Sequence, residues 1–88
     1  MTYNTPRTTT RRQQLTNGSA LKIARFRRGL GVSDVVAKLE TDFHLPVSAA
    51  HLRNIESGTR NASPRLLYAL AQLYKAEVDH FLLMRAET

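Results

Sequence analysis

The sequence contains no cysteine and no tryptophan, and only four of its 88 residues are glycine and three are proline. Without thiols the chain can form neither a disulfide nor a thiolate metal site, so packed apolar side chains must supply its stability. No apolar run approaches the roughly 20 residues that a membrane span requires. The hydrophobic content of 42% and the charged content of 23% are typical of a folded globular domain, and the length allows one small core.

Acidic residues are missing from the first third of the chain. Residues 29–88 hold six bases against seven acids, whereas residues 1–28 hold no acid and seven bases, Arg7, Arg11, Arg12, Lys22, Arg25, Arg27 and Arg28. The net charge of +6 therefore lies almost entirely in this first segment. Such a bias favours a polyanionic partner, of which nucleic acid is the commonest. A basic tail that merely increases solubility is the alternative that composition leaves open.

Apolar periodicity divides the chain into an arm, a domain and a tail. Residues 1–18 have no apolar period and predict a flexible basic arm. Over residues 19–84, helix-start signals at Ser19, Gly31, Ser48 and Ser63 precede apolar residues at three- and four-residue spacing. A fifth short element follows over 78–84, and no segment alternates like a strand. The sequence thus predicts an all-α domain of five short helices, with 85–88 as a C-terminal tail.

The third predicted helix carries the most specific motif. It is Val47-Ser48-x-x-x-Leu52-x-x-Ile55-Glu56-x-Gly58-x-Arg60-Asn61. With this motif, residues 20–82 resemble the Cro/repressor (XRE-type) helix-turn-helix family, which is related to the DNA-binding domain of phage lambda repressor. The resemblance implies a compact five-helix lambda-repressor-like fold in which the helix 48–57 enters the major groove of DNA. It also implies an ion pair between Arg25 and Glu56 that ties the first helix to the end of the recognition helix.

The sequence departs from the family around the second helix. The family often has a phosphate-binding glutamine where Val32 stands, so that contact is missing here. Leu39 lies eight residues before Val47, which is more than the tight family turn needs. Residues 40–46 are therefore either an extension of the second helix or a longer loop.

Four residues of the recognition helix are expected to contact bases. Ala49 and Ala50 match base-contact positions of the family, where a methyl group can meet the methyl group of thymine. Asn54 can bind adenine through two hydrogen bonds, and His51 can donate to guanine or to a phosphate. The alternatives are that Asn54 is an ordinary solvated residue and that the alanines only favour the helix.

Phosphate contacts are expected around the same helix and from the arm. Ser57 and Arg60 match the family, whereas position alone suggests Ser48, Arg53, Asn61 and Arg65. The arm could follow a minor groove or a neighbouring backbone through Arg7, Arg11 and Arg12, or it could make no contact at all.

Signals for catalysis are missing from the sequence. His44, His51 and His80 are scattered, and neither a catalytic triad nor a set with metal-ligand spacing is recognisable. Gly29 and Gly31 separate two helices and do not form a phosphate-binding loop. We therefore expect no enzyme, no metal, no cofactor and no small-molecule substrate. An N-terminus without a secretory-type apolar core, in a chain without thiols, favours the cytoplasm.

These observations predict a sequence-specific regulator that binds double-stranded DNA. A small phage-type or bacterial repressor that occupies an operator, alone or as a homodimer, fits best. The alternative is a protein-interaction module on the same fold, such as an antitoxin that binds a toxin. Ile23 and Phe26 bear on this choice, because the family alignment places them on the outer side of the first helix. They could receive Leu15 of the arm, a second copy or a partner, or else belong to a slightly larger core.

Overall fold

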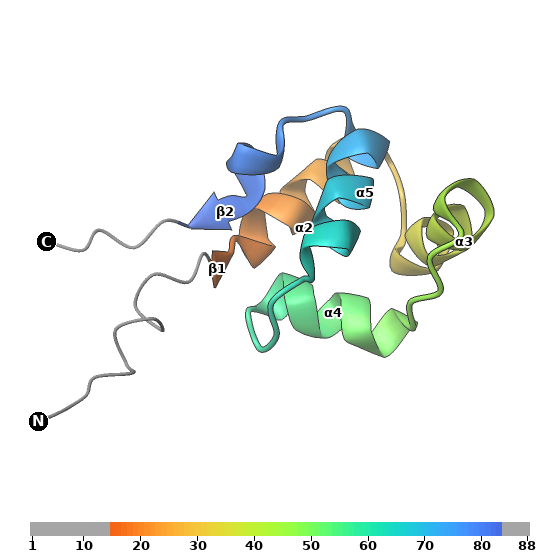
Figure 1. The fold of residues 1–88 in the computed structure, drawn as a ribbon, viewed down its shortest axis with the longest axis horizontal. Helices are drawn as coiled ribbons and strands as arrows, with labels where there is room; N and C mark the ends of the chain where they lie inside the picture. The colour runs from red at the N-terminus through yellow and green to blue at the C-terminus, as the bar shows by residue number, and fades with distance from the viewer. Residues whose placement is uncertain (1–14, 84–88) are drawn as a thin grey trace, which may run out of the picture.

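The computed structural model describes residues 15–83 and is mostly helical (Figure 1). Its α-helices are α2 (Gly18–Arg27), α3 (Val32–Phe43), α4 (Ala49–Ser57) and α5 (Pro64–Tyr74). The short 3₁₀ helix η2 (Val78–Phe81) follows. Strands β1 (Leu15–Thr16) and β2 (Leu82–Leu83) pair antiparallel, with Leu15 opposite Leu83. The described residues thus contain four α-helices and a two-stranded sheet, and the expectation of five helices without strands is wrong.

Side-chain caps fix the starts of two helices where the sequence placed them. The Ser48 hydroxyl oxygen accepts a hydrogen bond from the His51 backbone N–H at 3.0 Å, and that of Ser63 accepts one from Leu66 at 3.2 Å. Each bond satisfies a backbone donor that the first turn of a helix leaves open. Gly58 ends α4 in the left-handed conformation, with φ of 89°, which glycine adopts without steric cost.

The first helix begins two residues earlier than expected. Asn17, and not Ser19, caps α2, because its side-chain oxygen accepts a hydrogen bond from the Ala20 backbone N–H at 3.2 Å. Asn17 also donates its own backbone N–H to the carbonyl oxygen of Phe81 at 2.8 Å. The cap of α2 is therefore held in place by η2, which lies near the other end of the described chain.

Residues 40–43 extend α3 by a full turn, whereas 44–46 are loop, so each of the two alternatives for 40–46 holds for part of this segment. The helix ends at His44, whose φ of 53° is left-handed, and the Leu45 N–H donates to the carbonyl oxygen of Leu39 at 3.0 Å. Residues 44–48 then form the connection to α4, and Pro46 prevents further helix there.

Both ends of the predicted domain need correction. Residues 15–18 do not belong to the arm: Leu15 and Thr16 form β1, Asn17 caps α2 and Gly18 lies in α2. The predicted helix over 78–84 is instead the single 3₁₀ turn η2 followed by β2. Strands of two residues are too short to show alternation, and backbone hydrogen bonds between distant segments hold them. The expected arm residues Arg7, Arg11 and Arg12, and the tail 85–88, lie outside the described residues.

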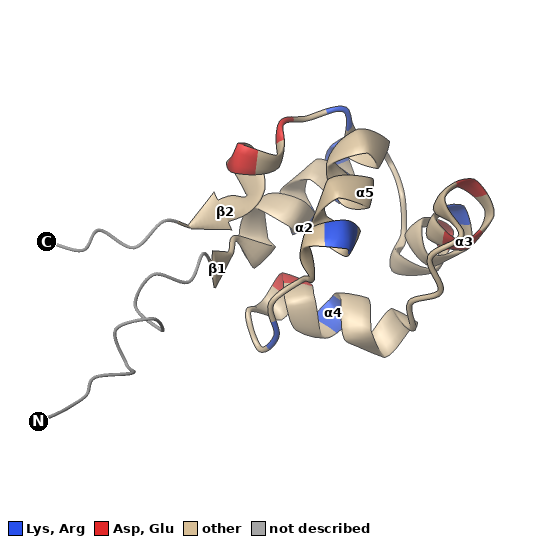
Figure 2. Ribbon diagram, in the orientation of Figure 1, with Lys and Arg blue, Asp and Glu red and all other residues tan. Residues whose placement is uncertain are grey.

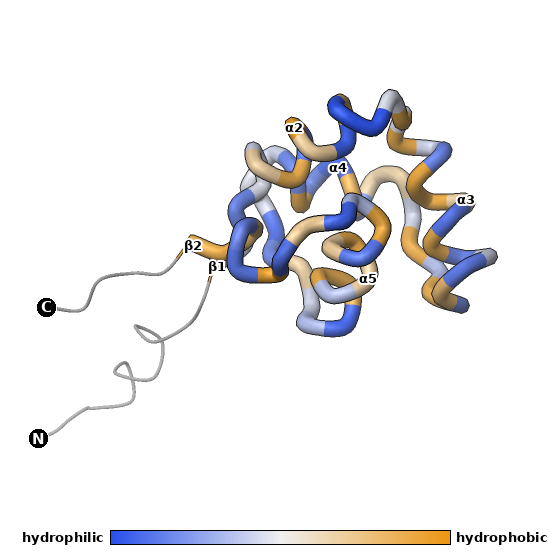
Figure 3. The backbone as a smooth tube through the Cα atoms, turned by 90° about the horizontal axis from the view of Figure 1, so that it is seen from above, coloured by the Kyte–Doolittle hydropathy of each residue, from blue (hydrophilic) through white to orange (hydrophobic). Residues whose placement is uncertain are grey.

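One apolar core joins all the helices. Hydrophobic and hydrophilic residues alternate along the helices (Figure 3). The fully buried side chains come from α2, α3, α4, α5 and η2; they are Leu21, Val35, Leu39, Leu52, Ile55, Leu70 and Phe81. Ile23 and Phe26 do not belong to this core, since they are 51% and 60% exposed. The alternative of a larger core that includes them is wrong.

Tyr74, at the end of α5, is buried with an unpartnered hydroxyl. Its ring packs edge-on against Phe81, with 6.1 Å between the centroids. The hydroxyl has no hydrogen-bond partner among residues 15–83. Burial disfavours the phenolate, with the nearby Glu56 carboxylate adding to the effect, and raises the pKa of Tyr74 well above its ordinary value.

We expect Tyr74→Phe to be at least as stable as the parent at neutral pH, because it removes a buried polar group that costs about 1–3 kcal/mol when unpartnered. Since the raised pKa favours the neutral phenol in the folded state, stability should fall as pH rises above about 10, the ordinary pKa of tyrosine. The phenylalanine variant should lose less stability over this range. Urea unfolding at several pH values measures both effects, with Tyr68→Phe as the exposed control. A clear loss of stability at neutral pH would mean that the Tyr74 hydroxyl has a partner.

Candidate nucleic-acid interface

Helix α4 has one buried side and one exposed side. Leu52, Ile55 and Glu56 are buried where α4 packs against α2 and α3. The exposed side chains of α4 are Ala50, His51, Arg53, Asn54 and Ser57. Three of the four predicted base contacts, Ala50, His51 and Asn54, are therefore accessible, whereas Ala49 is half-buried.

Ala50, His51 and Asn54 lie on the same face of α4, because residues three and four apart are neighbours on a helix. The Asn54 side chain makes no hydrogen bond within residues 15–83, although its backbone carbonyl accepts from Thr59 and Arg60 at 2.9 and 3.1 Å. Its amide is therefore available to a ligand. This face carries a methyl group, an imidazole and an amide, which can all contact base edges.

Arginines flank this face from three segments. Arg53 lies on α4, Arg60 on the loop after it and Arg65 in the first turn of α5, and all three are exposed. Figure 2 shows blue segments on α4, on the loop that follows it and near the start of α5. None of the three forms an ion pair within the described part of the chain, and guanidinium groups stay charged at physiological pH. The only acid of α4, Glu56, is buried, so no carboxylate of α4 itself opposes an anion here.

The other three predicted phosphate contacts already take part in hydrogen bonds within the protein. Ser48 caps α4, and the Ser57 hydroxyl donates to the carbonyl oxygen of Asn54 at 3.1 Å and also contacts Thr59. The Asn61 side-chain oxygen accepts the Thr16 backbone N–H at 3.0 Å. The Ser48 hydroxyl proton and the Asn61 amide nitrogen remain as donors. These side chains therefore shape the loops around α4, and Ser57 has little left to offer a phosphate.

Arg25 and Glu56 are brought together as a buried pair between α2 and α4. The Arg25 Nε and Nη2 atoms each donate to a carboxylate oxygen of Glu56 at 2.8 Å. Arg25 Nη1 also donates to the carbonyl oxygen of Leu30 at 3.0 Å, which holds the turn after α2. The hydrogen bond with Glu56 raises the pKa of Arg25 above its ordinary value. This pair fixes the C-terminal half of α4 and hence the orientation of its exposed face.

Two contacts that support α4 and its following loop were missed in the sequence. Thr16 joins β1 to the loop after α4, since its hydroxyl accepts the Ala62 backbone N–H at 2.9 Å while its own N–H binds Asn61. Gly18 touches the C-terminal turn of α4 so closely that no side chain fits there. The only sequence signal was the Asn17-Gly18 pair, which indicated a turn and not a contact.

Other classes of site find little support in the described residues. Within 15–83, no three His, Asp or Glu side chains are grouped so that they could hold a metal ion. None of the helices in this range has the length and apolar character to cross a bilayer.

Comparison with family models, with curated proteins and with solved structures found no match to this chain. The case for a function therefore depends on the residues themselves.

Proposed function

We propose that this chain is a sequence-specific regulator that binds double-stranded DNA, with α3 and α4 as a helix-turn-helix and α4 as the recognition helix. The observation that carries the proposal is the exposed face of α4. It combines Ala50, His51 and Asn54 with flanking arginines from three segments and exposes no acid of its own.

The geometry suits the two kinds of contact that DNA recognition needs. A major groove about 12 Å wide admits one α-helix, and Asn54 would hydrogen-bond a base edge there while Ala50 allows close approach. Arg53, Arg60 and Arg65 would contact phosphates on either side and fix the register. Bound at an operator, such a protein would repress transcription by occupying the site. The basic arm would add phosphate contacts.

A protein-interaction module remains the second candidate function, because Ile23 and Phe26 are exposed on α2. Neither lies on α4. We favour DNA binding for the α4 face, since it presents hydrogen-bonding and cationic groups and no large exposed apolar side chain.

Two alanine variants should separate base contacts from phosphate contacts. Asn54→Ala should weaken binding to a selected duplex by about 1–3 kcal/mol but leave binding to random duplex nearly unchanged. Arg60→Ala should weaken both and reduce the slope of log K against log salt by about 0.9, because one counterion fewer is released. Gel-shift titrations at four salt concentrations measure these quantities, with exposed Lys38 on α3 replaced by alanine as a control. Equal losses of Asn54→Ala on both duplexes would remove Asn54 from the base contacts, and an unchanged slope would remove Arg60 from the phosphate contacts.

A further inference from the structure

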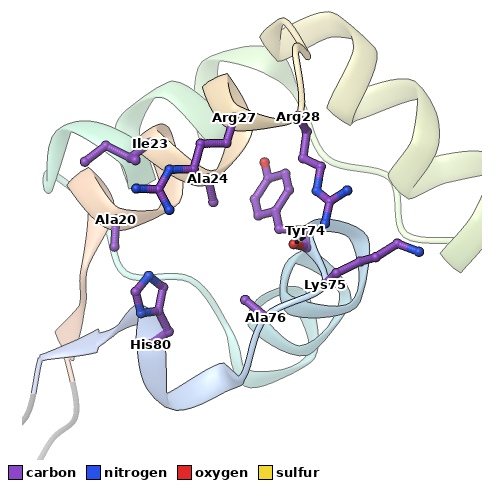
Figure 4. A pocket seen from close by; sticks show the side chains of 9 residues that line it. All are labelled: Ala20, Ile23, Ala24, Arg27, Arg28, Tyr74, Lys75, Ala76 and His80. Carbon is purple, nitrogen blue, oxygen red and sulfur yellow. Dashed lines mark hydrogen bonds between the residues drawn. The ribbon is translucent and has the colours of Figure 1, made fainter.

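A concave surface lies between α2 and the turn that joins α5 to η2 (Figure 4). The hollow encloses about 570 Å³. Ile23, Ala24 and Ala76 supply apolar lining, while Arg27, Arg28 and Lys75 supply three positive charges. No residue of α4 lines it, and Figure 1 shows α4 and this turn at opposite sides of the molecule.

The charges around this hollow are of one sign. Arg28 is held in place, because its Nη2 donates to the carbonyl oxygen of Tyr74 at 3.2 Å. Arg27 and Lys75 form no ion pair with any residue in 15–83. The nearest acids in sequence, Glu77 and Asp79, are not among the lining residues, although Glu77 lines an adjoining hollow that shares Lys75 and Ala76 with this one.

An exposed aromatic ring adjoins the hollow along α2. Phe26 lies three residues after Ile23 and is therefore its neighbour on the helix surface. The Arg25 guanidinium lies 4.9 Å from the centre of the Phe26 ring, and the Lys22 ammonium 5.9 Å. The α2 patch, defined as Ile23, Phe26, Arg27, Arg28 and Lys75, thus combines two large exposed apolar side chains with three cations.

We propose that the α2 patch docks an acidic segment of a partner protein, which inserts an apolar side chain into the hollow and places carboxylates on Arg27 and Lys75. A second copy of this chain fits poorly, since a two-fold contact would bring the same cations together. A DNA backbone fits poorly as well, because it has no large apolar group that could pack against Ile23 and Phe26. No residue of α4 lines the hollow, so a partner there could be held while α4 binds DNA.

The test is an NMR titration of the full chain with a synthetic peptide of alternating glutamate and leucine. We expect saturable shifts confined to the amides of residues 20–28 and 74–80. The double substitution Arg27→Glu/Lys75→Glu should weaken binding at least tenfold, and Ile23→Ser should do the same without changing charge. Arg53→Glu/Arg65→Glu, on α4 and α5, changes the net charge by the same amount away from the hollow and should have little effect. A peptide with serine in place of leucine should not bind measurably.

Three results would overturn the proposal. One is no saturation at millimolar peptide. Another is equal binding of the serine peptide, which would leave only a general attraction between charges. The third is that the Arg27→Glu/Lys75→Glu variant loses affinity for duplex DNA while peptide binding is unchanged, which would make the patch a second DNA contact. The peptide titration contains no DNA, so a failure of α4 to bind DNA would not change its outcome.

Discussion

Glu56→Ala is expected to destabilise the protein by about 3–5 kcal/mol, because it would leave the buried Arg25 guanidinium without its carboxylate. Two of the three hydrogen bonds of Arg25 end on Glu56, and both residues are less than 10% exposed. A loss of this size is a large part of the total stability of a small domain. Urea unfolding followed by circular dichroism measures it.

Two further variants make this result specific. Glu40→Ala removes an exposed carboxylate from α3 and should change stability by less than about 0.5 kcal/mol. The double variant Arg25→Met/Glu56→Leu removes both charges together and should recover much of the loss, since packed apolar residues often replace a buried pair at little cost. If Glu56→Ala and Glu40→Ala have equally small effects, the pair does not hold α2 to α4.

Gly18→Ala should cost about 3 kcal/mol or more, because the added methyl group would overlap backbone atoms. A Cβ at position 18 would lie 2.4 Å from the Ile55 carbonyl oxygen and 2.5 Å from that of Glu56. Backbone atoms in a packed helix cannot relieve the overlap by changing rotamer, as a flexible side chain can. The variant must therefore push α2 away from the C-terminal turn of α4.

Gly31→Ala is the matched control for this prediction. A Cβ at position 31 would meet only the Asp34 side chain, at 3.4 Å, which is ordinary contact. The φ of Gly31 is −85°, which any residue can adopt. Gly31→Ala should therefore lower the free energy of unfolding by less than about 1 kcal/mol. Comparable melting temperatures for the two variants would contradict the close packing of α2 on α4.

Local signals predicted most helix boundaries correctly. Ser48, Ser63-Pro64 and Gly58 act through bonds and angles within a few residues, so the sequence alone reveals them. The sheet and the 3₁₀ turn could not be predicted in this way. Asn17 and Phe81 are 64 residues apart in sequence, yet a backbone hydrogen bond joins the cap of α2 to the end of η2.

The candidate site, too, was predicted correctly where local patterns or the family resemblance define it and not where distant segments meet. The apolar spacing of Leu52 and Ile55 predicted which side of α4 is exposed, and the family resemblance supplied the pairing of Arg25 with Glu56. Asn61 was expected to bind phosphate, but its side-chain oxygen accepts a hydrogen bond from β1. The sequence could not reveal this, because nothing near Asn61 indicates that Thr16 folds back onto it.

The most direct test of sequence-specific binding by α4 is the ratio of affinities for selected and random duplex DNA. Duplexes would be enriched from a random library by the full chain, and the dissociation constants then measured at one physiological salt concentration. We predict that the selected duplex binds at least about 10³-fold more tightly than random duplex, as specific DNA-binding proteins do. Equal affinity for the two, or a selection that yields no common sequence, would contradict sequence-specific recognition.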